Sequence, residues 1–362
     1  MLIVDSHEDL AYNIRCFGRD YTRSVAETRA QERDTDIPAH NGSALLGWPD
    51  YQQGQVAVVF GTLFATPKRM QVGAWDTQVY ADFEQAHAVY SNQMDAYHRL
   101  VDEHPDRFHL IRSRAGLNAV IEGWKTNPLA KNPVGIVTLM EGAEGVRHPG
   151  ELDEWWARGV RLIGPAWAGT RYCGGTREPG PLTSDGYALL EAMAALGFGL
   201  DLSHMDARAA LQALDIYPGT VVASHSNAAA LLKGLDSNRH LPDDVLRGLI
   251  ERGGVIGVLP YNKFLLPGWQ QSERRDRVSL QHVVAQIDYI CQMAGDARHV
   301  GIGTDFEGGF GVECVPVEID TIADLQKLAP LLAERGYCDS DIAAIFGENW
   351  LAKLAQILPE VS

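Results

Sequence analysis

The chain opens with Met1-Leu-Ile-Val-Asp-Ser-His7-Glu-Asp9. The apolar run Leu2-Ile3-Val4 is followed at once by polar residues, which is typical of a short buried strand whose carboxyl end carries functional side chains. His7 and Asp9 lie two residues apart, so on an extended backbone both side chains point the same way. An imidazole beside a carboxylate at a strand end can hold a divalent metal ion. A lone His-x-Asp is common by chance, so this reading depends on further ligands at later strand ends.

Apolar segments of strand length recur along the chain and mostly alternate with helical patterns. Eight principal strands are predicted to begin near residues 2, 55, 134, 160, 198, 220, 255 and 299. They are continuously apolar, which favours a parallel sheet covered on its outside. Eight such units predict an α/β fold, the (β/α)₈ TIM barrel of the metal-dependent hydrolase type. A doubly wound open sheet is the alternative, but it would carry a phosphate or dinucleotide fingerprint in an early turn, and we find none.

We expect residues 1–362 to form one barrel domain with an insertion near 15–53. That polar stretch is interpreted as an insertion over the barrel mouth, or as a short helix with loops. A glycine-rich loop is expected over 169–180. Apolar spacing predicts helices over about 77–103, 114–124, 151–158, 184–196, 207–214, 242–252, 280–294, 322–335 and 340–355.

Composition excludes some classes of partner. Lys and Arg number 31 against 47 Asp and Glu, a net charge of −16, which argues against nucleic acid or an anionic membrane. The five cysteines are scattered without a CxxC pair, as reduced thiols in a cytoplasmic protein would be. No basic-then-apolar leader and no membrane-length apolar run is found, so we expect a soluble, cytoplasmic protein.

Further metal-type ligands do follow later strands. In a barrel the carboxyl ends of the strands converge on one face, where active sites are built. Imidazole and carboxylate ligands suit Zn²⁺ or a similar ion. The residues at or just past predicted strand ends are His7, Asp9, Glu141, His204, His225 and Asp305.

The simplest arrangement of these ligands is two ions bridged by one carboxylate. Glu141 is the best bridge because it lies on a middle strand, and no lysine stands at a strand end where it could bridge as a carbamate. A water between the ions would be the nucleophile, and Asp305 its general base, later passing the proton to a leaving amine.

These motifs together resemble the membrane (renal) dipeptidase family, from residue 2 nearly to the end of the chain. The resemblance implies an amidohydrolase-type barrel with two zinc ions, often dimeric, so a homodimer is one expected partner. The motifs are Asp5-Ser-His7-Glu-Asp9, Met140-Glu141-Gly142, Leu202-Ser-His204, Ala223-Ser-His225-Ser226, Asn238-Arg239-His-Leu-Pro-Asp-Asp244, Gly253-Gly-Val-Ile-Gly257, Gly301-Ile-Gly-Thr-Asp305-Phe and Phe346-Gly-Glu-Asn-Trp350-Leu.

The resemblance also implies roles for individual residues. His7 and Asp9 would hold one zinc and His204 and His225 the other, with Glu141 on both. Asp305 would be the catalytic acid/base. Arg239 would bind the substrate carboxylate, although it could instead be a surface cation near a helix start.

The sequence departs from the family at Trp167. Well-studied members carry a substrate-contacting histidine there, so substrate identity is the weakest part of the comparison. Trp167 is expected to place an apolar face at the site. Tyr261 could line the barrel mouth or be a core aromatic. Cys173 could in principle be a nucleophile, but no group is seen that would orient a base toward it.

The leading hypothesis is therefore a zinc-dependent dipeptidase acting on small peptides, with a D-residue at the C-terminus as one variant. One alternative is a hydrolase of another amide or ester on the same metal site. Another is a non-catalytic metal-binding protein, which loss of the general base would favour, but Asp305 is present.

Overall fold

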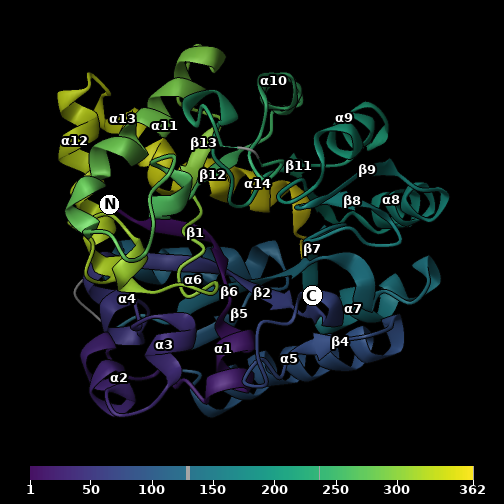
Figure 1. Ribbon diagram of the computed structural model, residues 1–362, viewed down its shortest axis with the longest axis horizontal. Coiled ribbons are helices and arrows are strands. Elements are labelled where there is room, and N and C mark those ends of the chain that lie inside the picture. Colours follow the sequence, from purple (N-terminus) through teal and green to yellow (C-terminus); the bar gives the residue numbers. More distant parts are fainter. Residues whose placement is uncertain (128–130, 236, 362) are drawn as a thin grey trace.

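The computed structural model describes residues 1–127, 131–235 and 237–361. Eight parallel strands follow one another in the order β11-β10-β7-β6-β2-β1-β13-β12 (Figure 1). The two ends of this sheet meet through a bridge between Ala223 and Ile256, so the barrel is nearly closed and the predicted TIM barrel is confirmed. The strands are β1 (Ile3–Glu8), β2 (Val56–Phe64), β6 (Val134–Glu141), β7 (Val160–Gly164), β10 (Gly199–Asp201), β11 (Val221–Val222), β12 (Ile256–Val258) and β13 (Val300–Ile302).

A ninth strand, β5 (Phe108–Leu110), pairs with the first residues of β6. The neighbour β7 pairs only with the later residues of β6, from Thr138 onward. β5 therefore covers the part of β6 that β7 does not reach, so fewer backbone groups of β6 lack hydrogen-bond partners.

Helices cover the outside of the barrel, as apolar parallel strands require. β1, β2 and β6 are buried along their whole length. The covering helices are α5 (Phe83–Glu103), α6 (Arg114–Thr126), α7 (Leu152–Arg158), α8 (Ser184–Leu196), α9 (Ala207–Ile216), α10 (Asp243–Glu251), α11 (Leu280–Ala294), α12 (Leu328–Glu334), α13 (Asp339–Ala343) and α14 (Asn349–Ile357).

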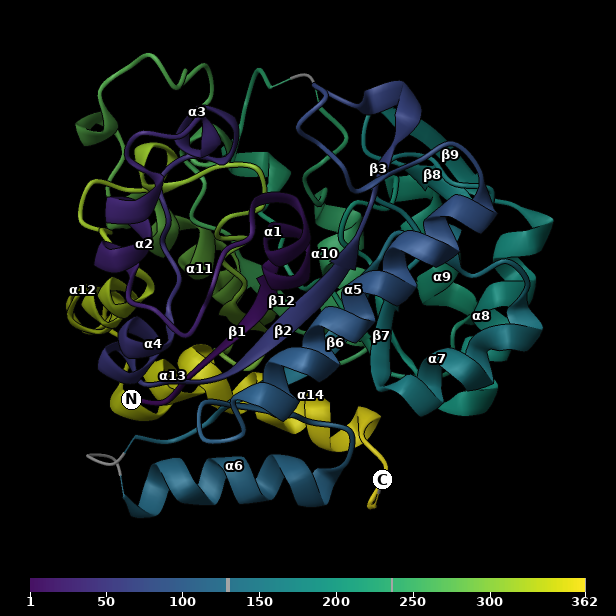
Figure 2. The same ribbon diagram turned by 90° about the horizontal axis from the view of Figure 1, so that it is seen from below.

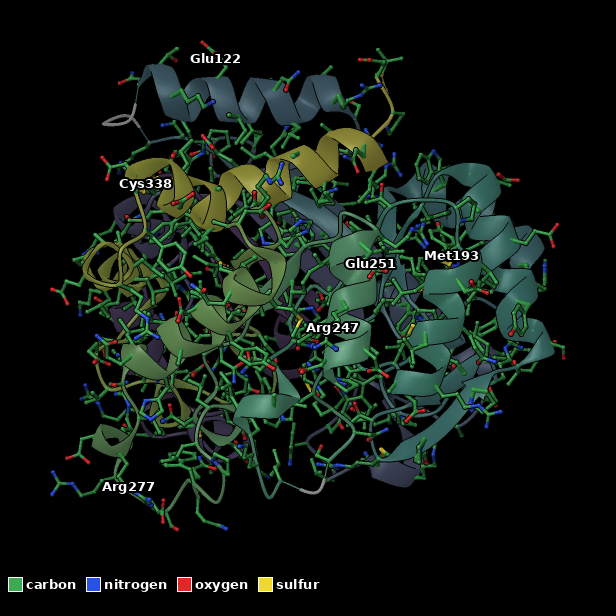
Figure 3. The ribbon with its side chains drawn as sticks, turned by 90° about the horizontal axis from the view of Figure 1, so that it is seen from above. Glu122, Met193, Arg247, Glu251, Arg277 and Cys338 are labelled. Atoms are coloured by element: carbon green, nitrogen blue, oxygen red, sulfur yellow. The ribbon has the colours of Figure 1, made fainter. Side chains whose placement is uncertain are left out.

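One end of the barrel is closed by the last helices of the chain. Figure 2 and Figure 3 show α6 lying beside α14, with Glu122 on the outer side of α6 and Cys338 beside the closing helices. The chain end is tied to α6, since Arg114 N donates to Pro359 O over 2.8 Å and the Arg114 guanidinium pairs with Glu360.

The stretch near 15–53 expected as an insertion contains the end of α1 (Leu10–Phe17) and three further short helices, α2 (Val25–Glu32), α3 (Ile37–Asn41) and α4 (Trp48–Gly54). Their anchor is the buried carboxylate of Glu307, two residues beyond Asp305. Glu307 accepts hydrogen bonds from Arg19 Nη1 at 2.6 Å, from Tyr21 Oη at 2.8 Å and from Leu45 N at 2.7 Å. The same contacts therefore hold the segment that carries Asp305.

Several elements differ from the expectation. The helix expected from residue 77 begins at Phe83, because Asp82 caps it by accepting from Gln85 N, and Val79–Tyr80 pairs instead with Thr66–Pro67. The expected glycine-rich loop is largely a hairpin of β8 (Cys173–Gly175) and β9 (Glu178–Leu182).

The two closing helices are also more broken than expected. The first starts as a 3₁₀ helix over Ile322–Lys327, and a π-helical turn over Ala344–Glu348 interrupts the second.

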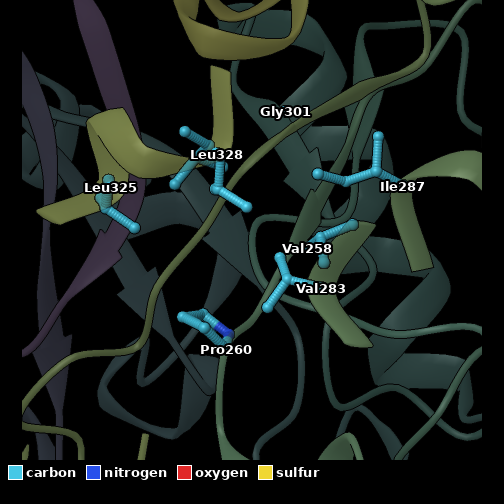
Figure 4. A pocket seen from close by; sticks show the side chains of 8 residues that line it. Val258, Pro260, Val283, Ile287, Gly301, Leu325 and Leu328 are labelled. Atoms are coloured by element: carbon cyan, nitrogen blue, oxygen red, sulfur yellow. The ribbon is translucent and has the colours of Figure 1, made fainter. Parts of the chain in front are cut away.

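A small apolar cavity lies between the barrel and its covering helices (Figure 4). Val258 lines it from β12, Val283 and Ile287 from α11, and Leu328 from α12. Its volume of about 10 Å³ is room for one water at most, so it is a packing defect rather than a ligand site.

No helix in the described part of the chain combines the length and the apolar character needed to cross a bilayer.

We expect Gly301→Ala to lower the free energy of unfolding by about 1–3 kcal/mol. A Cβ at Gly301 in β13 would lie 2.1 Å from Trp350 Nε1, and this indole is fully buried and donates to Ile302 O. Gly116→Ala in α6 is the matched control, because its Cβ would meet nothing closer than 3.5 Å, and it should leave stability unchanged or slightly higher. Urea unfolding measures both, and equal midpoints for the two variants would contradict the packing argument.

Candidate metal centre

The six residues singled out at strand ends all lie at the same mouth of the barrel. Glu141 is the last residue of β6 and His7 lies in β1, with Asp9 directly after it. His204, His225 and Asp305 each follow a strand by three residues. Their ligand atoms form three overlapping groups, in each of which the atoms lie within 4.8 Å of one another: His7 with Asp9 and Glu141, Glu141 with His204 and His225, and His7 with His225 and Asp305.

One carboxylate oxygen lies at the centre of this cluster. Three imidazole Nε2 atoms surround Glu141 Oε1, at 3.0 Å for His204, 3.4 Å for His225 and 3.6 Å for His7. The Nε2 atoms of His204 and His225 face each other at 2.9 Å. Glu141 therefore belongs to two of the groups, one with His204 and His225 and the other with His7 and Asp9.

The electrostatics of the cluster suit a cation. Burial opposes protonation of His7, but the carboxylates of Glu141, Asp305 and Asp9 raise its pKa to about 9. Burial and the charge of Glu141 raise the pKa of Asp9 to about 6. Burial and the neighbouring carboxylates Asp9 and Glu141 also raise the pKa of Asp305 well above its usual range. Crowded carboxylates that resist ionisation are what a divalent cation would relieve.

Two of the three imidazoles have the protonation state that metal binding needs. Burial, with the nearby guanidinium of Arg239, lowers the pKa of His204 to about 4 and that of His225 well below its usual value. Both rings are therefore neutral at neutral pH, as metal ligands must be. The buried Nε2 of His7 has no hydrogen-bond partner among the described residues. The donor set and this unpartnered atom fit a binuclear metal site.

Two of these residues hold unusual backbone conformations. His204 and Asp305 have φ of +65° and +55°, the left-handed region that side chains other than glycine rarely adopt. Such conformations persist only where surrounding contacts impose them, and they cluster at functional sites. The strand ends are therefore bent so that these two side chains turn into the mouth.

Sequence reasoning missed the residues that orient the ligands. Thr62 Oγ1 donates to Asp9 Oδ1, and Thr176 Oγ1 lies 2.9 Å from His204 Nδ1. Ser224 Oγ lies 2.9 Å from His225 Nδ1. The sequence did offer a signal, because a serine directly precedes each of two histidines: Ser203 before His204 and Ser224 before His225. Nothing in the sequence says where either hydroxyl points.

Arg239 is not the surface cation that was one reading of the sequence. It is buried at the barrel mouth, where Nη2 donates to His225 O at 2.8 Å and Nη1 lies 3.3 Å from Ser226 Oγ. Its Nε has no partner among the residues the structure describes. A buried guanidinium with a donor to spare is suited to a ligand carboxylate.

Trp167 and Tyr261 lie on walls of the same mouth. The Trp167 ring is half-buried, 6.1 Å from the His204 ring and 5.0 Å from Phe64. Tyr261 stacks on Phe310 with 4.3 Å between ring centres, and burial, with smaller contributions from Cys314 and Asp305, raises its pKa. Trp167 thus presents an aromatic face beside a candidate ligand.

Cys173 lies in the β8–β9 hairpin and is fully buried. Burial raises the pKa of its thiol to about 12, so the thiolate that a nucleophile requires is scarce at neutral pH.

Trp155 is a core residue, and Trp156 packs against the core.

Comparison with known proteins decides the family. The family model described as membrane dipeptidase, peptidase family M19, matches residues 1–358. The chain belongs to the membrane dipeptidase family. This confirms the resemblance found in the sequence and identifies the chain as a member of a dipeptidase family of metallopeptidases.

Named relatives of this M19 chain agree. It is 27% identical to dipeptidase verJ of Clonostachys rogersoniana, over 99% of this chain and 85% of that one. It is 33% identical to an uncharacterized protein in the pqqA 5′ region of Klebsiella pneumoniae, over 62% of this chain and 82% of that one.

Solved structures show the same fold. The probable dipeptidase PvdM of Pseudomonas aeruginosa superposes with a TM-score of 0.77 at 20% identity, over 99% of this chain and 95% of that one. A metallopeptidase of Rhodobacter sphaeroides, liganded with a phosphinate mimic of the dipeptide L-Ala-D-Ala, gives 0.77 at 22% identity, over 99% of each chain.

Proposed function

We propose that this M19 chain is a zinc-dependent dipeptidase that hydrolyses the amide bond of a dipeptide with a free C-terminal carboxylate. The observation that carries the proposal is the placement of Glu141 among three imidazoles, with the buried guanidinium of Arg239 beside them. Glu141 and the imidazoles offer lone pairs to metal ions, and the Arg239 guanidinium offers hydrogen bonds to a carboxylate.

The ligands divide into two sets. His7, Asp9 and Glu141 would hold one zinc, and Glu141, His204 and His225 the other, so Glu141 serves both. A pair of divalent ions supplies Lewis-acid chemistry, which polarises an amide carbonyl and lowers the pKa of a water.

Asp305 is proposed as the group that moves protons. Its Oδ1 lies 3.8 Å from His7 Nε2, at the edge of the cluster, and its side chain is 15% exposed. The carboxylate accepts a proton from the attacking water and passes it to the leaving amine.

Substrate contacts are proposed on opposite walls. Arg239 pairs with the C-terminal carboxylate and so limits substrates to those with a carboxylate near the scissile bond. Trp167 receives an apolar or aromatic side chain, and Tyr261 lines the far side. The dipeptide mimic on the Rhodobacter sphaeroides structure ends in a D-residue, which supports testing D-residues at the second position of this chain's substrates.

The cellular compartment and the oligomeric state are also proposed. The five cysteines are free, which supports a reducing compartment such as the cytoplasm. A homodimer is the proposed assembly.

The alternatives separate in one screen. Purified, zinc-loaded protein is offered dipeptides with L- and D-residues at each position, together with simple amides and esters. Turnover of amides or esters without a carboxylate would support the broader metal-dependent hydrolase, and no turnover with metal bound would support a non-catalytic protein.

We expect about two divalent ions per chain by elemental analysis, and loss of turnover on chelation that zinc restores. Glu141→Ala should remove most of both ions, because this side chain faces both ligand sets. Glu122→Ala on the exposed side of α6 is the control and should keep both (Figure 3). A protein without divalent metal, or with activity that chelators leave intact, would overturn the metal mechanism.

We expect Asp305→Asn to lower turnover by a factor on the order of 10² to 10⁴, because a positioned acid/base contributes about that much. The variant should retain its metal, since Asp305 stands at the edge of the ligand sets. Asp106→Asn, at a carboxylate 75% exposed, serves as control and should be unaffected. Near-normal turnover in Asp305→Asn would assign proton transfer to another group.

We expect amidation of a good substrate's C-terminus to cost about 2–5 kcal/mol in transition-state binding, because the Arg239 guanidinium is then left buried and unpaired. Arg239→Met should erase most of this difference between free acid and amide. Arg247→Met, at an exposed position on α10, should leave it unchanged (Figure 3). The measurement is kcat/KM on both substrates, and equal rates for acid and amide in the unmodified enzyme would rule out Arg239 as the anchor.

A further inference from the structure

The hydroxyl of Ser224 lies behind the metal ligands, at a point where several polar groups converge. Ser224 is fully buried. Its Oγ lies 2.5 Å from Asp201 Oδ2, 2.9 Å from His225 Nδ1 and 3.3 Å from His7 Nδ1. It thus touches one histidine from each of the two proposed ligand sets.

The direction of each hydrogen bond follows from counting hydrogens. A serine hydroxyl has one hydrogen to donate and two lone pairs to accept. The Asp201 carboxylate can only accept, and at 2.5 Å it is the closest neighbour, so the hydrogen of Ser224 points to it. The other Asp201 oxygen accepts from the backbone N–H groups of Ser203 and Ser224, which fixes the carboxylate in place.

Ser224 Oγ is then left with lone pairs only. The ring nitrogens that face it must therefore be donors, which places a hydrogen on Nδ1 of His225 and of His7. Ser203 Oγ also lies 3.3 Å away. It accepts from His225 N and keeps its own hydrogen, so it is a further donor toward Ser224 Oγ, while the Ser224 hydrogen stays on Asp201. With Nδ1 protonated, the neutral imidazole carries its lone pair on Nε2, the atom that faces Glu141.

The barrel is built to bring Ser224 this close. The Ser224 carbonyl oxygen accepts from Ser6 Oγ at 2.5 Å. A Cβ at either Gly257 or Gly303 would lie 1.9 Å from that same oxygen. The glycines of these two strand ends thus leave the space in which Ser224 sits.

We infer that Ser224, oriented by Asp201, is a positioning residue that fixes the tautomer of His225 and His7 and so couples the two halves of the metal centre. The inference rests on the proposed function only in that it needs the site to bind metal. Ser224 itself is not one of the proposed metal ligands or substrate contacts. It acts through the imidazoles, whose Nε2 lone pairs it keeps available.

The test compares three small substitutions by metal affinity, measured without substrate by competition with a zinc chelator. Ser224→Ala removes the acceptor and should weaken zinc binding about 10- to 100-fold, the usual effect of losing such a partner. Ser6→Ala is the matched control, because it also removes one buried barrel hydroxyl. That hydroxyl bonds the backbone oxygens of Ser224 and Ile302 but no imidazole in the described structure, so the variant tests backbone placement without removing the Ser224 hydroxyl and should change affinity less than about threefold.

Asp201→Asn separates tautomer control from simple packing. The amide is isosteric, but its NH₂ group would donate to Ser224 Oγ and force the serine hydrogen toward His225 Nδ1. The proton of His225 would then move to Nε2, the atom needed for metal. Asp201→Asn should therefore weaken zinc binding at least as much as Ser224→Ala, although it removes no atom from the site.

A second readout is the downfield imidazole N–H resonances of the zinc-loaded protein. We expect Nδ1–H signals from His225 and His7 in the unmodified protein and in Ser6→Ala, and their loss or shift in the other two variants. Thermal unfolding checks that each variant is folded, and each folded variant tests the inference by itself.

The outcomes distinguish this inference from the proposed function. Absence of zinc binding by the unmodified protein would overturn both. Two bound ions with unchanged affinity in Ser224→Ala and Asp201→Asn would overturn only the tautomer role, as would an Asp201→Asn variant that binds zinc as tightly as Ser6→Ala.

Discussion

Everything at the barrel mouth depends on one buried carboxylate oxygen, Glu141 Oε1, which three imidazole nitrogens approach to within 3.6 Å. Burial makes each ionised group costly unless opposite charge or hydrogen bonds compensate it. His7 and His204 hold the pKa of Glu141 well below its usual range although burial opposes this, while Asp9 and Asp305 are held toward their neutral forms. Protons thus offset the negative charge of the buried carboxylates, and a divalent cation would offset the same charge.

The surrounding structure maintains this crowding. Parallel strands bring side chains from distant parts of the chain to a single face, and their buried surfaces keep the strand ends rigid. His204 and Asp305 adopt left-handed backbone conformations that the local packing must hold. The Glu307 network ties the first four helices to the segment bearing Asp305, so those helices contribute to the position of the proposed proton carrier.

The two sides of the mouth differ in chemistry. Arg239 lies buried with its Nε unpartnered among the described residues, and its guanidinium lies over Phe264 at 5.8 Å. Beside His204, the rings of Trp167, Phe64 and Tyr12 contact one another in turn, Trp167 half-buried and the other two buried. A ligand with a carboxylate at one end and an apolar side chain at the other would match both, and Trp167 lies among the aromatic rings rather than in the His, Asp and Glu cluster.

The sequence by itself determined the eight strands, the parallel barrel and the set of candidate metal ligands at its mouth. It also determined helices such as 184–196 and 280–294 to the residue, because apolar periodicity and turn residues are local signals. Only the tertiary structure decided what surrounds those ligands. The contact between Ser224 and His7 joins residues 217 positions apart, and the burial of Arg239 depends on a loop folded back over His225. The space beside Gly257 and Gly303 is likewise set by a residue distant in sequence, because the Ser224 carbonyl oxygen occupies it. A residue's type and spacing indicate which chemistry it can do, but its hydrogen-bond partner and its depth depend on contacts that exist only once the barrel has closed.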